Sequence, residues 1–501
     1  MNILDKAIGY LSPESGLKRV RSRTAMQLFS QHEGFHKRRS YDGAKKGRRT
    51  SDWLTLSTSA NAETLYVLED LRNRARDLVR NNPYADKAVR SYASNLVGTG
   101  IIPRLKKDKK SPNLAPLWKK FAKKCDFDED TDFYGLQSLA ARALFESGEC
   151  LIVRKNVPSS YNLDIPLQIQ VLEPDFLDGK KNQNVLDNGG YIIQGIEFNQ
   201  AGKKVAYWMF DRHPGDMGKC SASKRIEAKW VIHLFEKKRP GQVHGVTSFA
   251  SAMLRMKDLA DYDDAELFSK KIQACFTGFV TTMDGEPGMV ETENDAKSGE
   301  RSEKFDPGTM TYLKPGEDIK FGTPEVSNTY PAYMRVVLHA IAAGLGLTYE
   351  LLTGDLSQAN YSSIRAGLIE FRRYMEAIRW QIMVPKMCEG VRDWFIEAAI
   401  ASGKLPDADY STEWTPPRFE SVDPVKDFTA LLIAVRGGFM SLPQAIGSQG
   451  EDTETILNEI AETNKMLDAL GIVLDSDPRN VAKTGVSQPN APTNNEANDA
   501  Q

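Results

Sequence analysis

The 501-residue sequence is poor in cysteine and histidine and contains no long apolar run, and each shortage argues against a class of protein. No stretch of about 18 apolar residues is present, which predicts that no helix spans a membrane. The first residues lack the basic and apolar regions of a secretory signal, which predicts no secretion. The five cysteines form no CxxC pair and lie far from the six histidines, which predicts reduced thiols and leaves a zinc site without support.

Motifs of several enzyme classes are also missing. GxxxxGK[ST] is absent, which argues against a P-loop ATPase, and HExxH, GxSxG and GxGxxG are absent as well. We therefore predict no enzymatic activity, no catalytic residue, no cofactor and no metal site.

The formal net charge of −2 hides an uneven distribution of charge. Residues 1–110 contain 23 Lys and Arg against 11 Asp and Glu, which leaves 42 basic and 56 acidic side chains for the rest of the chain. A basic head on an acidic body indicates different partners at the two ends. We interpret residues 1–59 as a mobile basic arm that rests on nucleic acid or on an acidic neighbour, and a merely solvated tail is an equally good alternative.

The pattern of apolar residues predicts an α+β protein that is mostly helical. Helical periodicity begins near Asn61, breaks at Asn81-Asn82-Pro83 and resumes until Gly98. Short β-rich runs between Cys150 and Leu234 predict an antiparallel module without βαβ units. Two of these runs are 167–172, with one wet and one dry face, and 191–196, which we expect to be one strand. Further helices are expected at 117–124, 134–147, 247–276, 333–343, 362–401, 426–437, 442–448 and 451–470.

Acidic residues crowd the middle of the expected helix 247–276. Asp258, Asp261 and Asp264 lie three residues apart, close enough on one helix face to share a cation. The cluster between Asp258 and Glu266 could therefore supply the carboxylates of a two-metal nuclease. Crowded carboxylates on a helix are far more often a solvated face, and we prefer that interpretation.

Several blocks of sequence, in one order along the chain, resemble the lambda family of phage portal proteins. The first block is DLVRNNPYADKAVR at 77–90, and the strongest is AGLGLTYELLTGDLS at 343–357, continued by NYSSIRAGLIEFRR at 360–373. Shorter blocks are ESGECL at 146–151 and GQVHGV at 241–246. The resemblance covers about residues 60–470 and leaves out the basic arm and the C-terminal tail.

The resemblance implies a portal fold assembled as a ring, usually a dodecamer, at the portal vertex of the capsid in the virion. Double-stranded DNA, bound without sequence specificity, would pass through the ring during packaging and ejection. The implied partners are terminase, the major capsid and scaffold proteins, and the head-completion and tail proteins, with no membrane and with assembly in the host cytoplasm. The missing ATP site agrees with this function, because the terminase supplies the motor.

The resemblance further implies the portal domains called wing, stem, clip and crown. In chain order we expect the basic arm at 1–59, the wing at 60–246, the first stem helix at 247–276, the clip at 277–328, the second stem helix at 329–344, the tunnel loop at 345–362, the long wing helix and its connection at 363–423, the crown at 424–475 and a disordered tail at 476–501.

The tunnel loop carries one set of candidate site residues: Gly354, Asp355, Gln358, Asn360 and Arg365. We expect Gln358, Asn360 and Arg365 to contact DNA. Glycine and asparagine suit a loop that bends sharply, because they accept backbone angles that other residues avoid. An ordinary helix–helix connection is the alternative.

The stem carries the second set, Asp258, Asp261 and Asp264, which we expect to face the channel or a neighbouring subunit. A basic lining would hold duplex DNA by releasing its counterions, whereas negative charge repels the backbone and keeps friction low. Two other classes of protein stay open: a metal-dependent DNA-processing enzyme that uses the acidic cluster, and a capsid scaffolding protein.

Overall fold

The computed structural model describes residues 57–105, 114–158, 161–216, 221–274, 278–282, 317–321, 329–358, 360–420, 423–451 and 453–472, with a few isolated positions. The chain divides into two units, Met1–Ser59 and Ala60–Gln501, and nearly all the described residues belong to the second. Almost all of the arm expected at 1–59, most of the clip expected at 277–328 and the tail expected at 476–501 lie outside the described residues.

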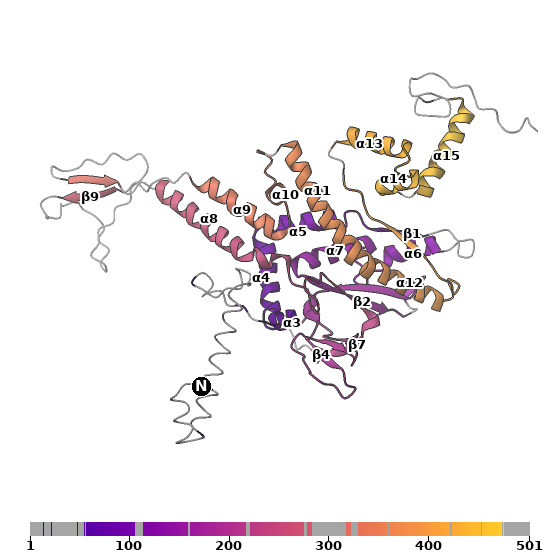
Figure 1. The fold of residues 1–501 in the computed structure, drawn as a ribbon, viewed down its shortest axis with the longest axis horizontal. Helices are drawn as coiled ribbons and strands as arrows, with labels where there is room; N and C mark the ends of the chain where they lie inside the picture. The colour runs from indigo at the N-terminus through magenta and orange to yellow at the C-terminus, as the bar shows by residue number, and fades with distance from the viewer. Residues whose placement is uncertain are drawn as a thin grey trace, which may run out of the picture. The chain divides into compact units, whose positions relative to one another are not determined.

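Helices form the first part of the second unit (Figure 1): α3 (Ala60–Thr64), α4 (Leu68–Asn81), α5 (Pro83–Leu96), α6 (Leu114–Lys124) and α7 (Phe133–Glu146). Asn82 caps α5, because its side-chain oxygen accepts the N–H groups of Tyr84 and Ala85, and Pro83 suits the first helical turn. Asp132 caps α7 in the same way. The expected helices are confirmed, but the break between α3 and α4 was not anticipated.

Two antiparallel sheets follow, which confirms the antiparallel module. In the three-stranded sheet β2 (Glu149–Asn156) lies between β3 (Leu167–Leu172) and β8 (Val231–Phe235). The four-stranded sheet has the order β4 (Tyr191–Ile193), β5 (Ile196–Phe198), β6 (Lys204–Met209), β7 (Lys224–Glu227).

The prediction of one strand at 191–196 is wrong, because the run folds into the hairpin β4–β5. Gln194 and Gly195 form its two-residue turn with φ of 47° and 81°. Positive φ at both turn residues matches the twist of the flanking strands, so Ile193 and Ile196 pair directly.

β2 is buried on both faces, because successive side chains of a strand point to opposite sides. Cys150 and Ile152 belong to the larger core, which they share with the helices. Leu151 and Val153 belong to a smaller core shared with the four-stranded sheet. On β3 the expected wet face is wrong in part, because Gln168 is buried and donates to two backbone oxygens.

Helices dominate the second half of the chain: α8 (Met253–Ala274), α9 (Tyr330–Leu345), α10 (Tyr349–Thr353), α11 (Tyr361–Ile378), α12 (Glu389–Ala401), α13 (Pro424–Arg436), α14 (Leu442–Ser448) and α15 (Thr453–Leu470). α8 starts later than the expected 247, because Ser248–Ser251 is a 3-10 turn. α8 and α9 run side by side (Figure 1), and Tyr262 of α8 stacks on Tyr330 of α9. Two antiparallel strand pairs complete the fold, β9 (Gly278–Thr282) with β10 (Glu317–Phe321) and β1 (Ile102–Leu105) with β11 (Thr412–Thr415).

The helix expected at 362–401 is confirmed in outline but changes type in its middle. Arg379–Cys388, which contains Pro385, is π-helical and joins α11 to α12. The buried Arg379 donates to the backbone oxygens of Leu96 and Asn95 at the end of α5, so it neutralises the negative end of that helix. Burial lowers the pKa of this guanidinium to about 10.

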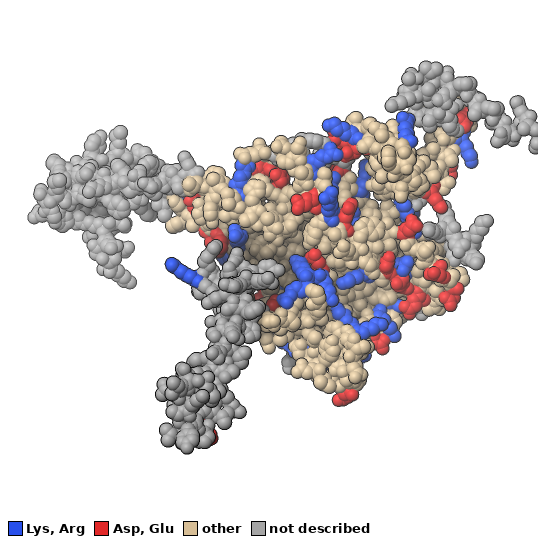
Figure 2. Space-filling view, in the orientation of Figure 1, with Lys and Arg blue, Asp and Glu red and all other residues tan. Residues whose placement is uncertain are grey.

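No helix among the described residues combines the length and the apolar character needed to cross a membrane. On the face drawn in Figure 2, basic and acidic side chains are interspersed over the described residues. Most of the basic excess of the first 110 residues belongs to sequence outside the described residues.

Candidate functional site

The acidic residues of α8 lie on an exposed helix, as expected. Asp258, Asp261 and Asp264 are exposed, and Asp261 pairs with Lys257 one turn earlier on the same helix. Among the described residues, the places where three ligand atoms could converge on one metal ion do not include α8. The carboxylates of α8 therefore lack the arrangement that a two-metal nuclease would need.

The segment expected as a tunnel loop, 345–362, is partly helical. Thr348 caps α10, because its hydroxyl accepts the N–H group of Leu351, and this short helix fills the first half of the segment. Gly346 and Gly354 flank α10 with φ of 70° and 78°, a conformation that favours glycine. The bend at Gly354 lies in the loop as expected, but the helix expected to end at residue 343 continues to Leu345 as α9, and the remaining loop begins at Gly354.

Asp355 fixes the start of this loop. Its Oδ1 accepts the N–H group of Ser357 at 2.9 Å, and its Oδ2 accepts the hydroxyl of Tyr349 at 3.2 Å. Hydrogen bonds from Ser357 lower the pKa of the Asp355 carboxyl. Arg335 of α9 lies 3.8 Å from the same carboxylate, so Asp355 joins the loop to both neighbouring helices.

The three residues expected to contact DNA are in different environments. Gln358 is exposed at the turn of the loop. Asn360 caps α11 in a reciprocal pair with Ser363, a role that accounts for its identity without DNA. Arg365 pairs with Asp427 of α13 at 3.1 Å and so connects α11 to the last helices.

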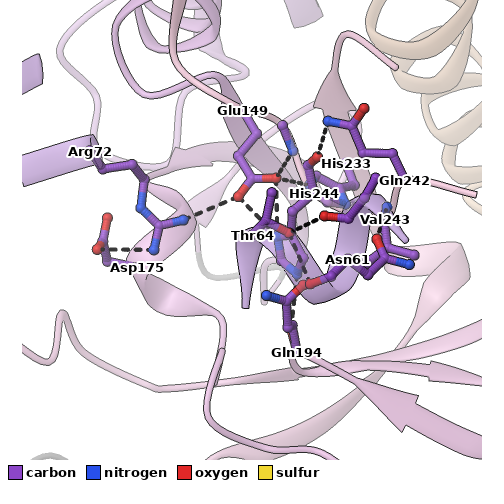
Figure 3. A network of polar contacts seen from close by, with 12 residues as sticks. Asn61, Thr64, Arg72, Glu149, Asp175, Gln194, His233, Gln242, Val243 and His244 are labelled. Atoms are coloured by element: carbon purple, nitrogen blue, oxygen red, sulfur yellow. Dashed lines mark hydrogen bonds and ion pairs between the residues drawn. The ribbon is translucent and has the colours of Figure 1, made fainter. Parts of the chain in front are cut away.

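A second polar site, which the sequence did not reveal, is built around Glu149 at the start of β2 (Figure 3). The carboxylate is fully buried and lies 2.9 Å from Nε2 of His233 on β8 and 3.0 Å from Nδ1 of His244. It also accepts the N–H group of Gly245 at 2.6 Å and lies 3.2 Å from Arg72 of α4. Figure 3 shows Arg72 and the two histidines on opposite sides of the carboxylate.

Burial and charge set the protonation of this site. Burial alone would raise the pKa of Glu149, but the charge and hydrogen bonds of His244 and His233 outweigh it and hold the pKa well below its usual range. Burial lowers the pKa of His233 to about 4, and the bond to Glu149 offsets only part of that effect. Glu149 is therefore an anion and His233 is neutral at physiological pH.

Arg72 and Arg76 extend the site into a ladder of ion pairs along α4. Arg72 lies 3.6 Å from Asp175, and Arg76 pairs with both Asp175 and Glu173. His213 stands at the outer end, 3.3 Å from Glu173. The ladder joins α4 to the β module. At its ends lie the two groups, among the residues that the structure describes, whose ligand atoms could converge on a metal ion: Glu149, His233 and His244, and Glu173, Asp175 and His213.

Only one local signal pointed to the buried site. Gly148 and Gly245 flank Glu149 and His244, and a Cβ at Gly245 would lie 2.0 Å from the carbonyl oxygen of Gly148. Two backbone segments therefore meet so closely that only glycine fits, and this contact brings the polar residues together. Both glycines lie in blocks of the family resemblance, ESGECL and GQVHGV.

Two lysines beside this site support a first prediction. The ammonium groups of Lys204 and Lys386 lie 5.1 and 4.6 Å from the centre of the Phe235 ring, and neither pairs with a carboxylate among the described residues. Burial, aided by the charge of Lys386, lowers the pKa of Lys204 from 10.5 to about 8. Folding therefore removes a charged amine from water at neutral pH.

Lys204→Met is expected to raise the free energy of unfolding at pH 7 by roughly 1–3 kcal/mol. The unfolded chain binds more protons than the folded chain between about pH 8 and 10.5, so wild-type stability rises through that window and the difference from the variant closes. Urea unfolding at pH 7, 9 and 10.5 measures both effects. The exposed neighbour Lys203, changed to Met, is the matched control, and a loss of stability in Lys204→Met would contradict the prediction.

Comparison with known proteins gives the same family from several relatives. Residues 46–379 match the family described as phage portal protein, lambda family. The chain is 27% identical over 461 residues to the probable portal protein of Halomonas phage phiHAP-1, covering 87% of this chain and 88% of that protein. It is 21% identical over 499 residues to portal protein B of Escherichia phage lambda, covering 87% and 91%.

Solved structures match this chain more weakly, with TM-scores below 0.5. A chain from the neck of an empty gene transfer agent (GTA) particle matches with 15% sequence identity and a TM-score of 0.47. The match covers 75% of this chain and 93% of that chain. An HK97-family phage portal protein from Corynebacterium diphtheriae matches with 10% sequence identity and a TM-score of 0.31. That match covers 75% of this chain and 99% of the other.

Proposed function

The chain belongs to the lambda family of phage portal proteins, and on that premise we propose that its copies close into a ring that conducts double-stranded DNA at one vertex of the capsid. The function of the chain is that of a portal protein, and its family is a structural component of the capsid. The number of copies in the ring is proposed to be twelve, the usual number in the family.

The observation that supports a ring is a set of apolar side chains that are exposed to solvent in the described part of a single chain. α13 and α15 contain no buried residue. On α13, Val425, Phe428 and Leu432 recur at three and four residues and are 76%, 49% and 45% exposed. On α15, Leu457 and Ile460 are also exposed. We call these five side chains the C-terminal apolar surface.

Repeated contact between copies would cover this surface. Exposed apolar patches on a water-exposed chain mark sites of contact. Copies related by rotation contact one another head to tail and close a ring when the rotation closes. α8 also leaves apolar side chains exposed, with Leu254 near its start and Leu267 and Phe268 in its second half.

The expected portal domains can be assigned to the described elements. The wing comprises α3 to α7 and the two sheets, α8 and α9 form the stem, and β9 and β10 belong to the clip. The tunnel loop spans 345–362, α11 to α12 form the long wing helix, and α13 to α15 form the crown. The exposed Asp258, Asp261 and Asp264 face the channel or a neighbouring copy and keep the DNA from adhering.

The partners follow from the same proposal. Terminase and the head-completion and tail proteins dock on the clip, the capsid and scaffold proteins contact the wing, and DNA passes without sequence recognition. The ring therefore belongs to the portal vertex of the virion and assembles in the host cytoplasm. An enzyme using the α8 carboxylates is not favoured, because those carboxylates do not converge.

Negative-stain images of the purified full-length chain test the ring. Closed particles with a central hole wide enough for duplex DNA are expected. Isolated chains at all concentrations, or open shells of variable size, would overturn the proposal and favour an enzyme or a scaffolding protein respectively.

The DNA contacts at the tunnel loop are tested by three substitutions in one ring: Gln358→Ala, Asn360→Ser and Arg365→Gln. Serine still caps α11, so Asn360→Ser removes the amide without the helix destabilisation of about 1 kcal/mol that alanine would cause. The ring is expected to assemble normally but to lose most of the packaged DNA, measured by nuclease protection in filled heads. Normal packaging and retention would exclude these residues as DNA contacts. Glu370→Gln, at an exposed position of α11 beyond the loop, is the control.

A further inference from the structure

Glu149, His233 and His244 form a buried group of side chains to which the proposed DNA channel assigns no role. Glu149 lies at the start of β2, His233 lies on β8, and His244 lies in the segment between β8 and the 3-10 turn at Ser248–Ser251. Three separate parts of the wing therefore meet at this group. Their side chains are 0%, 2% and 4% exposed. One ligand atom from each lies within 4.8 Å of the others. We propose that this group binds one divalent transition-metal ion such as Zn²⁺, and that the bound ion stabilises the wing by linking these three segments.

The ligand types fit this ion. Two imidazole nitrogens and one carboxylate oxygen form a set that zinc takes in proteins, and imidazole also suits copper, iron and nickel. Magnesium and calcium prefer sets made of oxygen alone, so the group discriminates against them. One ligand atom of each residue lies close enough to the other two for a single ion to contact all three.

Outer hydrogen bonds hold two of the three ligands in place. Nε2 of His244 donates to the backbone oxygen of Gln194 at 3.0 Å, which turns Nδ1 toward Glu149. The Gly245 N–H group and Arg72 hold the carboxylate. Metal ligands in proteins have such partners, which fix their orientation and raise their affinity.

The charge around the group also permits an ion. Arg72 lies on the far side of the carboxylate from the histidines (Figure 3) and is balanced by Asp175. Nδ1 of His244 faces the Glu149 carboxylate, and Nε2 faces the Gln194 oxygen. A metal ion between Nδ1 and the carboxylate would take the place of the hydrogen that joins them, and that proton would leave to solvent.

A route to the group is present. A cavity of about 480 Å³ is lined by Arg72, Gln194 and His244 together with Tyr66, Pro174 and Phe210. His244 therefore stands at the wall of a space that solvent and a hydrated ion can enter. An ion held there ties β2, β8 and the His244 segment together at one point.

Titration with Co²⁺, a coloured stand-in for Zn²⁺, tests the site on the full-length wild-type chain after treatment with a chelator. We expect the visible absorption of cobalt bound to nitrogen ligands to saturate at one ion per chain and to disappear when Zn²⁺ is added. His244→Ala removes a ligand, so its affinity is expected to fall by more than the 10- to 100-fold typical of losing an outer hydrogen-bond partner. His213→Ala, in the second group with Glu173 and Asp175, is the matched control and should keep wild-type affinity.

The wild-type titration decides alone if His244→Ala does not fold. Absence of saturable cobalt absorption would overturn the proposal, and the group would then be a buried hydrogen-bond network without a metal ion. Binding that survives His244→Ala, or that is lost in His213→Ala, would overturn it as well, because the ion would then sit elsewhere.

Discussion

Replacing Glu149 by alanine is expected to lower the free energy of unfolding by about 3–5 kcal/mol, the cost of removing one member of a buried ion pair. The carboxylate is the common partner of the half-buried Arg72 and of His233, His244 and the Gly245 N–H group, which are buried. Alanine leaves these donors facing one another without the anion that they share. Chemical unfolding in buffer with a chelator measures the loss without any contribution from a bound metal ion.

Glu173→Ala is the matched control, because it removes a carboxylate from the same ladder of ion pairs. Its side chain is 53% exposed, so its loss is expected to cost only about 0–1 kcal/mol. Equal losses in the two variants would contradict the view that Glu149 holds the wing together. Combining Glu149→Ala with Arg72→Met should recover part of the loss, because it also removes a buried cation.

Local sequence explains the elements that were predicted well. The boundary of α5 follows from Asn82 and Pro83, which act on their own neighbours, and the α8 and α11 helices follow from residues within one segment. The hairpin at Gln194-Gly195 was missed because glutamine rarely takes a positive φ, so the pair lacks the usual Asn-Gly signal. The pairing of β1 with β11 was missed for another reason, since it joins Ile102 to Thr415 and no periodicity reports so distant a partner.

The candidate sites show the same division. Gly346 and Gly354 could be placed at bends from sequence, because each glycine acts at its own position. The Glu149 group could not, because its histidines lie 84 and 95 residues away along the chain. A histidine in an apolar β run indicates a buried position, but a single Glu or His does not indicate which partners it meets. Its burial here depends on the two backbone segments that meet at Gly148 and Gly245.

The double substitution Phe428→Asp and Ile460→Asp is expected to prevent ring closure. Both side chains belong to the C-terminal apolar surface, where we propose that a neighbouring copy packs. An aspartate there loses its water without gaining a partner, at a cost of several kcal/mol per ion. A loss of about 1.4 kcal/mol in binding free energy raises the dissociation constant tenfold, so association between copies should weaken by at least about 100-fold. Size-exclusion chromatography with light scattering measures the mass of the assembly.

Asn458→Asp on α15 is the matched control, because it adds the same charge at an exposed polar residue and should leave the ring intact. Helix content should stay unchanged in all variants, since every substituted side chain is exposed in the single chain. Rings of normal mass from the double variant would remove the C-terminal apolar surface from the interface. Phe268→Asp would then test α8, where Leu254, Leu267 and Phe268 are exposed. Loss of the ring in that variant would place the contact between copies along α8, because the two surfaces lie on different helices.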